Sequence, residues 1–305
     1  MNCSIRSNIG TAMITFEQMR IFLAVAEREH LTEAAKALLL TPSAVSSAIH
    51  MIEEHYQVRL FNRIGRRIQL SDAGSVFVED CRRTLAQVKL SETTLREFSG
   101  LKRGALGLYA SQTIANYFLP PVIAKFRNLY PAITVKMSIG NTEQVENAVL
   151  SGLTDIGFAE GTIKNENLHR QKVADDELFT IAAKNHPLTK KTYAKFKDIS
   201  AFPWILREKG SGTRAIFEQS LSNHGYDFTD LEVMQTFPSN EAVLSAVAAS
   251  NALTAISKRV ASASLASGLV ERLNFLSVKR DFLLLLNPQR FKTKAVGAFI
   301  DLLDG

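Results

Sequence analysis

Small hydroxyl-bearing residues gather in the segment TPSAVSSAI, residues 41–49, directly after a run of three leucines. Thr41 can cap the start of a helix, and Pro42 suits its first turn because an N–H there would have no partner. A helix with short polar side chains can enter the DNA major groove and bond phosphates or base edges. The alternative is that the hydroxyls only cap and solvate a surface helix. The candidate DNA contacts in this segment are Thr41, Pro42, Ser43, Ser46, Ser47 and His50.

Arginines crowd the next segment, VRLFNRIGRRIQLSDAG, residues 58–74. It predicts two short strands, Arg59–Phe61 and Ile68–Leu70, joined by a turn at Gly65. A β-hairpin with arginines at its tip can contact phosphates or a minor groove beside the helix. The alternative is a hairpin that only faces solvent, but its place after a capped helix favours DNA contact. The arginines assigned to that contact are Arg63, Arg66 and Arg67.

Three turns beyond Gly104 together carry hydroxyls, glycines and arginines that can hold a small anion. They are ASQTIANY, IGNTEQV and LREKGSGTRAIFE, and each leads from an apolar run into a helical pattern. Helix N-termini present free N–H groups at such turns. The alternatives are that the hydroxyls are helix caps and that Arg214 pairs with Glu218, four residues on. The candidate effector contacts are Ser111, Thr113, Asn141, Thr142, Glu160, Arg207, Gly210, Ser211, Gly212, Thr213 and Arg214.

A helix-turn-helix is needed to position the first set of contacts. From Thr15 onward, apolar side chains recur every three or four residues, which predicts an amphipathic helix. Thr32 can cap a short second helix, EAAKALLL, and Thr41 begins the third. The side chains of the third helix that we expect to face the core are Ala44, Val45, Ile49 and Ile52.

The stretch 72–98 predicts one long helix, because it has no proline and its only glycine is Gly74. Its apolar residues step by three and four, a short heptad seam with Glu92 as an acidic interruption. So narrow a stripe favours pairing with a second copy of the helix; the alternative is packing against its own domain. Cys81 on this seam is interpreted as a small hydrophobic residue and not as a redox sensor. The seam residues are Val78, Cys81, Leu85, Val88 and Leu95.

The sequence beyond Gly104 predicts a mainly parallel sheet with covering helices, because apolar runs alternate with helical stretches. The length of the chain beyond Gly104 suits two α/β lobes. The acidic run 175–177 is expected at a strand start and in solvent. The apolar runs are 105–110, 133–139, 156–158, 204–206, 253–257 and 282–286.

The bulk composition is that of an ordinary globular protein, with 305 residues, 46% apolar and 22% charged. A net charge of +6 fits a polyanionic partner without proving one. Cys3 and Cys81 lie too far apart in unlike contexts to suggest a disulfide framework. No apolar run approaches a membrane span and no signal-peptide core is present, so we expect a cytoplasmic protein. Residues 1–13 are expected to be a disordered leader, with translation starting at Met1 or Met13.

Catalysis is not expected. None of the six histidines has a metal-ligand spacing, and neither a nucleophile elbow nor a dinucleotide fingerprint occurs. We therefore predict no catalytic residue, no metal and no cofactor. The rival interpretations are a transport solute-binding protein and a ligand-free architectural DNA-binding protein. The N-terminal helices argue against a transport protein. The size of the part beyond Gly104, about two-thirds of the chain, argues against a ligand-free architectural protein.

Residues 15–74 resemble the winged helix-turn-helix of LysR-type transcriptional regulators. The segments FEQMRIFLAVAEREHLTEAAKALLLTPSAVSSAI and LFNRIGRRIQLSDAG carry the resemblance. The family often has Gln-Pro-Ala-Val-Ser-Arg-Gln where this chain has residues 42–48, so its usual arginine is Ser47 and its second glutamine is Ala48. Those changes remove long hydrogen-bond donors from the presumed reading face and leave the operator sequence open.

The part of the chain beyond Gly104 resembles the family's effector-binding domain, which is related in fold to bacterial solute-binding proteins. The segments GNTEQVENAVLSGLTDIGFAEG and PWILREKGSGTR are most similar to the branch that regulates sulfur assimilation and carbon fixation. That resemblance implies a small-molecule effector between the lobes: an oxyanion such as sulfite or sulfate, or a compact carboxylate or phosphate metabolite. Ser111, Thr113 and the loop 210–214 match positions that commonly touch effectors in the family.

The expected organisation is a leader at 1–13, a winged helix-turn-helix at 14–72, a linker helix at 73–100 and an α/β effector domain at 104–305. Lobe I is expected at 104–165 and 272–305 and lobe II at 166–271, with a hinge at 99–104 ahead of both. The chain is expected to cross between the lobes near 163–172 and 264–273. The resemblance also implies a homodimer through the linker helix, a homotetramer through the effector domains, and double-stranded promoter DNA as a partner. RNA polymerase is a partner if the regulator is an activator.

Overall fold

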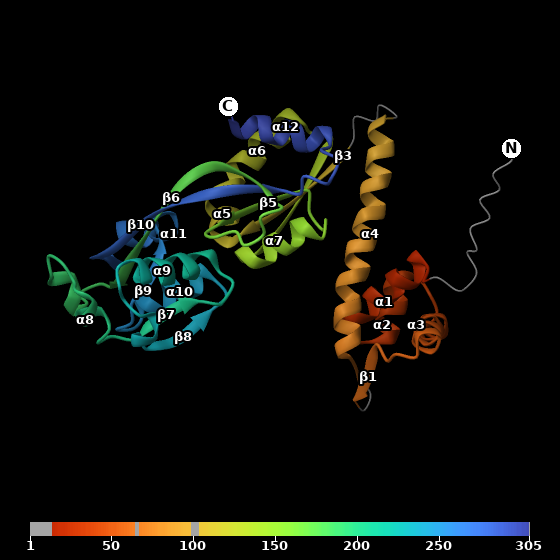
Figure 1. The fold of residues 1–305 in the computed structure, drawn as a ribbon, viewed down its shortest axis with the longest axis horizontal. Helices are drawn as coiled ribbons and strands as arrows, with labels where there is room; N and C mark the ends of the chain where they lie inside the picture. The colour runs from red at the N-terminus through yellow and green to blue at the C-terminus, as the bar shows by residue number, and fades with distance from the viewer. Residues whose placement is uncertain (1–13, 65–66, 99–103, 305) are drawn as a thin grey trace. The chain divides into compact units, whose positions relative to one another are not determined.

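The computed structural model describes residues 14–64, 67–98 and 104–304. The chain divides into two compact units, residues 1–92 and 93–305 (Figure 1). The leader 1–13, the residues 65 and 66 at the hairpin turn, and most of the expected hinge lie outside the described residues.

The first unit contains three short helices. Thr15 caps the first of them in a capping box: its hydroxyl accepts from the Gln18 N–H, and the Gln18 side chain accepts from the Thr15 N–H. The second helix begins directly after the extended residue His30, so the predicted cap at Thr32 is wrong, because Thr32 already lies inside the helix. The helices are α1 (Phe16–Arg28), α2 (Leu31–Leu38) and α3 (Pro42–Tyr56).

Apolar side chains from all three helices form a common core. Phe22 and Val25 of α1 are fully buried, as is Val45 of α3. Ala44 was also expected in this core, but it is exposed because it lies on the solvent side of α3; the half-buried Ala48 packs there instead. The other core positions expected on α3, Ile49 and Ile52, are buried as predicted.

Leu39 makes the tight connection between α2 and α3, with a left-handed backbone at φ 58°. Its N–H donates to the carbonyl of Lys36 at 3.2 Å, and the N–H of Leu40 donates to that of Ala35 at 2.9 Å. These bonds satisfy carbonyls at the end of α2. Among the described residues no single helix is long and apolar enough to cross a bilayer; α2 and α3 would meet that test only as a pair, and they are bent by 109°.

A two-stranded antiparallel hairpin, β1 (Phe61–Ile64) and β2 (Arg67–Leu70), follows α3. The first strand begins two residues later than predicted. A Glu53 carboxylate oxygen on α3 accepts hydrogen bonds from the N–H groups of Leu60, at 2.7 Å, and Phe61, at 3.2 Å. The hairpin is therefore tied at its base to the side of α3.

The long helix α4 (Asp72–Phe98) covers the whole of the predicted stretch 72–98. Val78 and Cys81 were predicted to pair with a second copy, but they are buried in the core of the first unit. Packing against the same domain, the alternative for this seam, is therefore correct for these two residues. Farther along α4, Leu85 and Val88 are half-buried, and 70% of the Leu95 surface is exposed.

The second unit is built on a six-stranded sheet of order β4-β3-β5-β10-β6-β9. Strands β3, β4 and β5 are parallel, but β10 is antiparallel to both β5 and β6, and β6 is antiparallel to β9. The expectation of a mainly parallel sheet is therefore wrong for the half of the sheet around β10. A separate parallel pair, β7 and β8, completes the strands of this unit. The bounds are β3 (Gly104–Ser111), β4 (Ile133–Gly140), β5 (Ile156–Glu160), β6 (His169–Ala183), β7 (Trp204–Arg207), β8 (Val233–Phe237), β9 (Thr254–Ser257) and β10 (Val270–Leu286).

Helices cover the strands of both lobes. In lobe I, α5, α6 and α12 pack on one face of the sheet and α7 packs on the other (Figure 1). In lobe II, α9 packs on one side of β7 and β9, and α10 and α11 pack on the opposite side. The helices are α5 (Gln112–Tyr117), α6 (Leu119–Leu129), α7 (Thr142–Leu150), α8 (Phe196–Ile199), α9 (Gly212–Asn223), α10 (Asn240–Ala248), α11 (Lys258–Ala266) and α12 (Lys294–Asp304), with short 3₁₀ turns η1 (Pro187–Lys190) and η2 (Phe228–Asp230).

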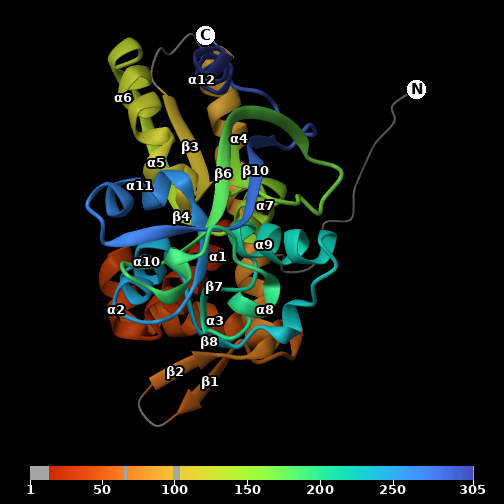
Figure 2. The ribbon, with the colours of Figure 1, turned by 90° about the vertical axis from the view of Figure 1, so that its left-hand side faces the viewer.

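The two long strands β6 and β10 run side by side through both lobes (Figure 2). On β10, Leu276 packs in the core of lobe II and Phe282 in that of lobe I. On β6, Ala174 packs against the lobe I core and Leu178 belongs to the lobe II core. The chain therefore crosses at about 174–178 and 276–282, later than the predicted 163–172 and 264–273, because each crossing lies inside a strand and not in a loop.

Candidate DNA interface and effector site

The predicted DNA-contacting side chains lie on the outer face of α3. Ser43, Ser47 and His50 are exposed, and Ser46 is half-buried. The hydroxyl of Thr41 is also exposed, but it accepts a hydrogen bond from the Ala44 N–H at 3.2 Å and lies 3.0 Å from the Ser43 hydroxyl. Thr41 therefore caps the helix, and the serines and His50 form its open polar face.

A groove of about 590 Å³ lies between the side of α3 and the base of the hairpin. His50, Glu54 and Arg59 are among the residues that line it. The Nε2 atom of His50 lies 3.7 Å from a carboxylate oxygen of Glu54, one helical turn along. Sequence analysis did not include Arg59 among the DNA contacts, although it is the first arginine of the same segment.

Two of the three predicted arginines, Arg63 and Arg67, lie on the strands of the hairpin. Arg63 pairs with Ile68, and Arg67 pairs with Ile64, in the antiparallel register of β1 and β2. Arg66 lies outside the described residues. The two strands pair as an antiparallel hairpin, although the first strand is shifted from its predicted range, and Arg63 and Arg67 lie on these strands.

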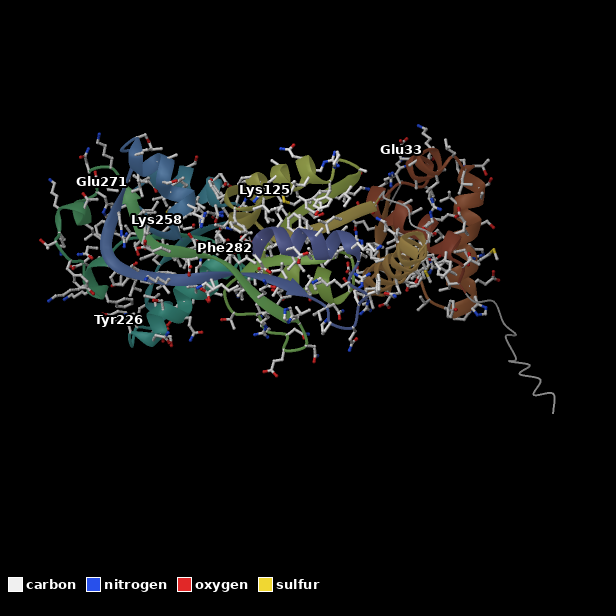
Figure 3. The ribbon with its side chains drawn as sticks, turned by 90° about the horizontal axis from the view of Figure 1, so that it is seen from above. Glu33, Lys125, Tyr226, Lys258, Glu271 and Phe282 are labelled. Atoms are coloured by element: carbon white, nitrogen blue, oxygen red, sulfur yellow. The ribbon has the colours of Figure 1, made fainter. Side chains whose placement is uncertain are left out.

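Arg280, on the crossing stretch of β10, is the centre of a buried polar cluster between the two lobes. Its Nε donates to a carboxylate oxygen of Asp176 on β6 at 2.8 Å, and its Nη1 donates to the Thr213 hydroxyl on α9 at 2.9 Å. The guanidinium carbon lies 5.9 Å from the ring centroid of Phe282, which Figure 3 labels. The interlobe cluster consists of Ser111, Thr113, Glu160, Asp176, Thr213, Asn240 and Arg280, all buried.

Glu160, at the end of β5, reaches the same cluster from lobe I. One carboxylate oxygen accepts a hydrogen bond from the Ser111 hydroxyl, and the other lies 3.7 Å from Nη1 of Arg280. Its backbone carbonyl accepts from the Thr142 hydroxyl at 2.8 Å. A Cβ added at Gly212 would lie 2.0 Å from that carbonyl, so only glycine allows the N-terminus of α9 to approach β5 this closely.

Asn240, the first residue of α10, connects lobe II to lobe I. Its Nδ2 donates to the Thr113 hydroxyl at 3.1 Å, and its N–H donates to the Gln112 side chain at 2.6 Å. Its Oδ1 accepts from Nη1 of Arg207 at 2.8 Å. Arg207 is buried and also makes two hydrogen bonds to Glu208. The predicted role of Arg207 at the cleft is thus indirect, through Asn240.

The rim of the cleft carries a second link, between Glu241 and lobe I. Its carboxylate accepts from Tyr117 at 3.1 Å and Asn116 at 3.3 Å. Burial works to raise the pKa of Glu241, but hydrogen bonds from its own N–H, Ser239, Asn116 and Tyr117 lower it below its usual value. Burial, and then the neighbouring Glu241, raises the pKa of Tyr117. Both shifts keep the proton on the tyrosine that donates this bond.

Four predicted effector residues serve structural contacts. Asn141 caps α7 in a capping box, and Gly210 adopts φ +88° while its carbonyl accepts from the Glu143 N–H. Ser211 precedes α9 and is buried, with its N–H donating to the Glu208 carbonyl. Arg214 pairs with Glu218 at 2.7 Å, as its alternative interpretation predicted, and its guanidinium also lies over the Phe228 ring. The guanidinium of Arg214 is thus held within lobe II, and its assignment to an effector contact stays a prediction.

Sequence analysis missed three members of the interlobe cluster, Asp176, Asn240 and Arg280. Asp176 belongs to the acidic run that was expected in solvent, but its side chain is buried against Arg280 and Ser257. The exposed Asp175 pairs instead with Lys172. Alternation along the strand was the available signal, since only every second residue of 175–177 points inward. Among the described residues, no three His, Cys, Asp or Glu side chains are grouped to hold a metal ion.

Comparisons with known proteins agree with this architecture. Residues 16–75 match the "Bacterial regulatory helix-turn-helix protein, lysR family" description, and residues 99–305 match "LysR substrate binding domain". The uncharacterized HTH-type transcriptional regulator YeiE of Escherichia coli K12 is 35% identical over 84% of each chain.

Two solved structures are similar. CbnR, a regulator solved in complex with its target DNA, superposes with a TM-score of 0.70 at 19% identity, over 95% of this chain and 99% of that one. The regulatory domain of CcmR from Synechocystis PCC6803, solved in complex with 2-PG, gives 0.60 at 26% identity over 66% of this chain and 96% of that one. The named relatives are regulators and not enzymes. This chain belongs to the LysR family of DNA-binding transcriptional regulators, with an N-terminal helix-turn-helix domain and a C-terminal effector-binding domain.

Proposed function

We propose that a small anionic effector, bound between the two lobes, controls how this regulator binds DNA or activates transcription. The observation that carries the proposal is Arg280. This buried guanidinium bonds Thr213 in lobe II and faces Glu160 in lobe I, beside the hydroxyl of Ser111. Hydroxyls and a guanidinium suit an oxyanion or a compact phosphate or carboxylate metabolite. The complex of the similar CcmR domain with 2-PG supports a small ligand in this class of domain.

A ligand held by both lobes can act only by favouring one arrangement of the regulator over another. Every member of the interlobe cluster is buried, so the lobes must separate for a ligand to enter. The proposed effector therefore exchanges direct bonds between the lobes for bonds through the ligand.

The DNA-binding half of the proposal places the serine face of α3 against the major groove and the hairpin against neighbouring phosphates. Ser43, Ser47 and His50 are exposed for this contact. Replacing Arg66 with alanine should lower DNA affinity and flatten its dependence on salt, because one phosphate contact is lost. An unchanged salt dependence would remove this arginine from the interface.

The proposal includes a homodimer through α4 and a homotetramer through the effector domains. The partner is promoter DNA, and RNA polymerase is a further contact if the regulator is an activator. The proposed location of the regulator is the cytoplasm. Leu85, Val88 and Leu95 lie beyond the core of the first unit and are the residues left for a helix pair. A Leu95→Glu variant should shift the assembly towards smaller species in sedimentation experiments. An unchanged size would contradict this use of the helix.

The experiment that tests the proposed function is a gel shift of the protein on its upstream promoter DNA, with and without sulfite, sulfate, phosphate or 2-PG. We expect one of these anions to change the affinity or the pattern of bands. Thr213→Ala should weaken that response while DNA binding survives, because Thr213 bonds Arg280. The matched control is Ser222→Ala, an exposed position on the same helix. A full response in both variants would place the effector elsewhere.

A further inference from the structure

The interlobe cluster already contains a carboxylate at the point where the proposed effector would bind. Glu160 is buried, accepts a hydrogen bond from Ser111 and lies 3.7 Å from Nη1 of Arg280. Those are two of the donors that the proposed function assigns to an anion. Any anion that binds there must therefore share or replace the position of a carboxylate that belongs to the protein.

The charges around Glu160 do not favour a second bare anion. The charged group nearest to it is Arg280 on β10, whose Nε is already bonded to Asp176 on β6. The Ser111 hydroxyl on β3 donates to the carboxylate itself. Thr142 on α7 and Gly212 on α9 lie instead against the backbone carbonyl of Glu160. Arg259 lies 3.9 Å from the second carboxylate oxygen of Asp176, so the two carboxylates are matched by two guanidiniums and no positive charge is left over for a second bare anion. Two like charges at hydrogen-bond distance in a buried site repel strongly unless a proton lies between them.

A proton on the ligand removes this conflict. An oxyanion with one O–H can donate to Glu160, while its other oxygens accept from Ser111, Thr213 and Arg280. A fully deprotonated oxyanion has only acceptors, so it cannot donate to Glu160 and competes with it for the hydroxyl of Ser111 and the guanidinium of Arg280. A buried charged group that loses its partner costs about 1–3 kcal/mol or more, so the discrimination can be large.

We propose that Glu160 makes the site selective for oxyanions that carry a proton, such as hydrogen phosphate, a phosphomonoester monoanion or hydrogensulfite, and against sulfate. The inference depends on the proposed effector site and narrows its ligand class. Phosphate and sulfate are a matched pair of probes, because both are tetrahedral and of similar size, but only phosphate keeps a proton near neutral pH. Glu160 acts here as a specificity-determining residue that touches the ligand.

The test is calorimetric titration of the full-length protein with sodium phosphate and with sodium sulfate, at pH 7 and matched ionic strength. For the unaltered protein we expect phosphate to bind at least about 100-fold more tightly than sulfate. In Glu160→Gln the amide can donate to a bare oxygen, so sulfate affinity should rise and the ratio should fall to about 10-fold or less. Glu232→Gln, a change at an exposed position in lobe II, should keep the ratio of the unaltered protein.

The outcomes separate this inference from the proposed function. Equal affinity of the unaltered protein for phosphate and sulfate, or an unchanged ratio in Glu160→Gln, overturns the selectivity of Glu160 and leaves the anion site standing. Failure of both anions to bind either protein overturns the anion site as well. The measurement on the unaltered protein tests the selectivity even if Glu160→Gln does not fold, and a thermal melt of the variant shows whether it does.

Discussion

Asn240 in lobe II donates a hydrogen bond of 3.1 Å to the hydroxyl of Thr113 in lobe I. Both side chains are buried, and the same asparagine accepts from Arg207. A single amide therefore joins one lobe to the other and also satisfies a buried guanidinium. Contacts of this kind hold the lobes together, and the proposed effector would exchange them for bonds of its own.

Replacement of Asn240 by alanine should destabilise the effector domain by about 1–3 kcal/mol, because a donor of Arg207 would be buried without its partner. Urea unfolding followed by Trp204 fluorescence measures this, since Trp204 is the only tryptophan of the chain and is buried in lobe II. Asn223→Ala, on the exposed surface of α9, is the control. Equal midpoints for the two variants would mean that the asparagine contributes little.

Because His186 is buried, we expect the free energy of unfolding to fall in mild acid. Burial lowers the pKa of His186, whose Nδ1 accepts from the Leu188 N–H and whose Nε2 lies 3.2 Å from the Asn251 carbonyl. The unfolded chain takes up a proton near pH 6.5, while the folded protein resists it until a lower pH. This contribution is present above about pH 6.5 and is lost as the pH falls from there through the lowered pKa of the folded protein. Unfolding free energies from pH 8 to 5 should therefore decline more steeply for the native chain than for His186→Gln; parallel curves would contradict this.

Cys81 should be inert to thiol reagents while the protein is folded. Burial raises the pKa of Cys81 to about 12, so at pH 8 only about one thiol in ten thousand is the reactive thiolate. Iodoacetamide labelling of a Cys3→Ser variant measures this, because Cys3 is the only other cysteine. We expect slow labelling in buffer and rapid labelling in guanidinium chloride. Rapid labelling of the folded variant would restore a redox role for this thiol.

Leu39→Gly should stabilise the DNA-binding domain by about 0.5–1 kcal/mol. A left-handed backbone costs a residue other than glycine about 1–2 kcal/mol, and glycine removes this cost. Glycine also loses more conformational entropy on folding, which offsets about 0.5–1 kcal/mol of the stabilisation. The side chain of Leu39 is 94% exposed, so its loss removes almost no packing. Scanning calorimetry should show a higher midpoint for the unfolding of the DNA-binding domain. Trp204 fluorescence identifies the other transition, because Trp204 lies in the effector domain. The control is Leu38→Gly, which replaces a half-buried helical residue and should lower that midpoint.

Local chemistry made several parts of this structure predictable. The Thr41 cap and the helix that begins at Pro42 follow from side-chain hydrogen bonding and a fixed backbone angle, which need only neighbouring residues. The pairing of Arg214 with Glu218 follows from helix spacing in the same way. The hairpin was predicted too, but its start was not, because Glu53 of α3 binds the N–H groups that would have begun the strand.

The sequence by itself determined the order of the elements, the helix-turn-helix and the family, since these depend on spacing, caps and apolar period along the chain. Tertiary structure alone decided which polar residues meet between the lobes. Asp176 and Arg280 are 104 residues apart, and they touch because β6 and β10 pair in one particular register. That register is fixed by the packing of two lobes around the crossing strands, a cooperative property that no short segment encodes.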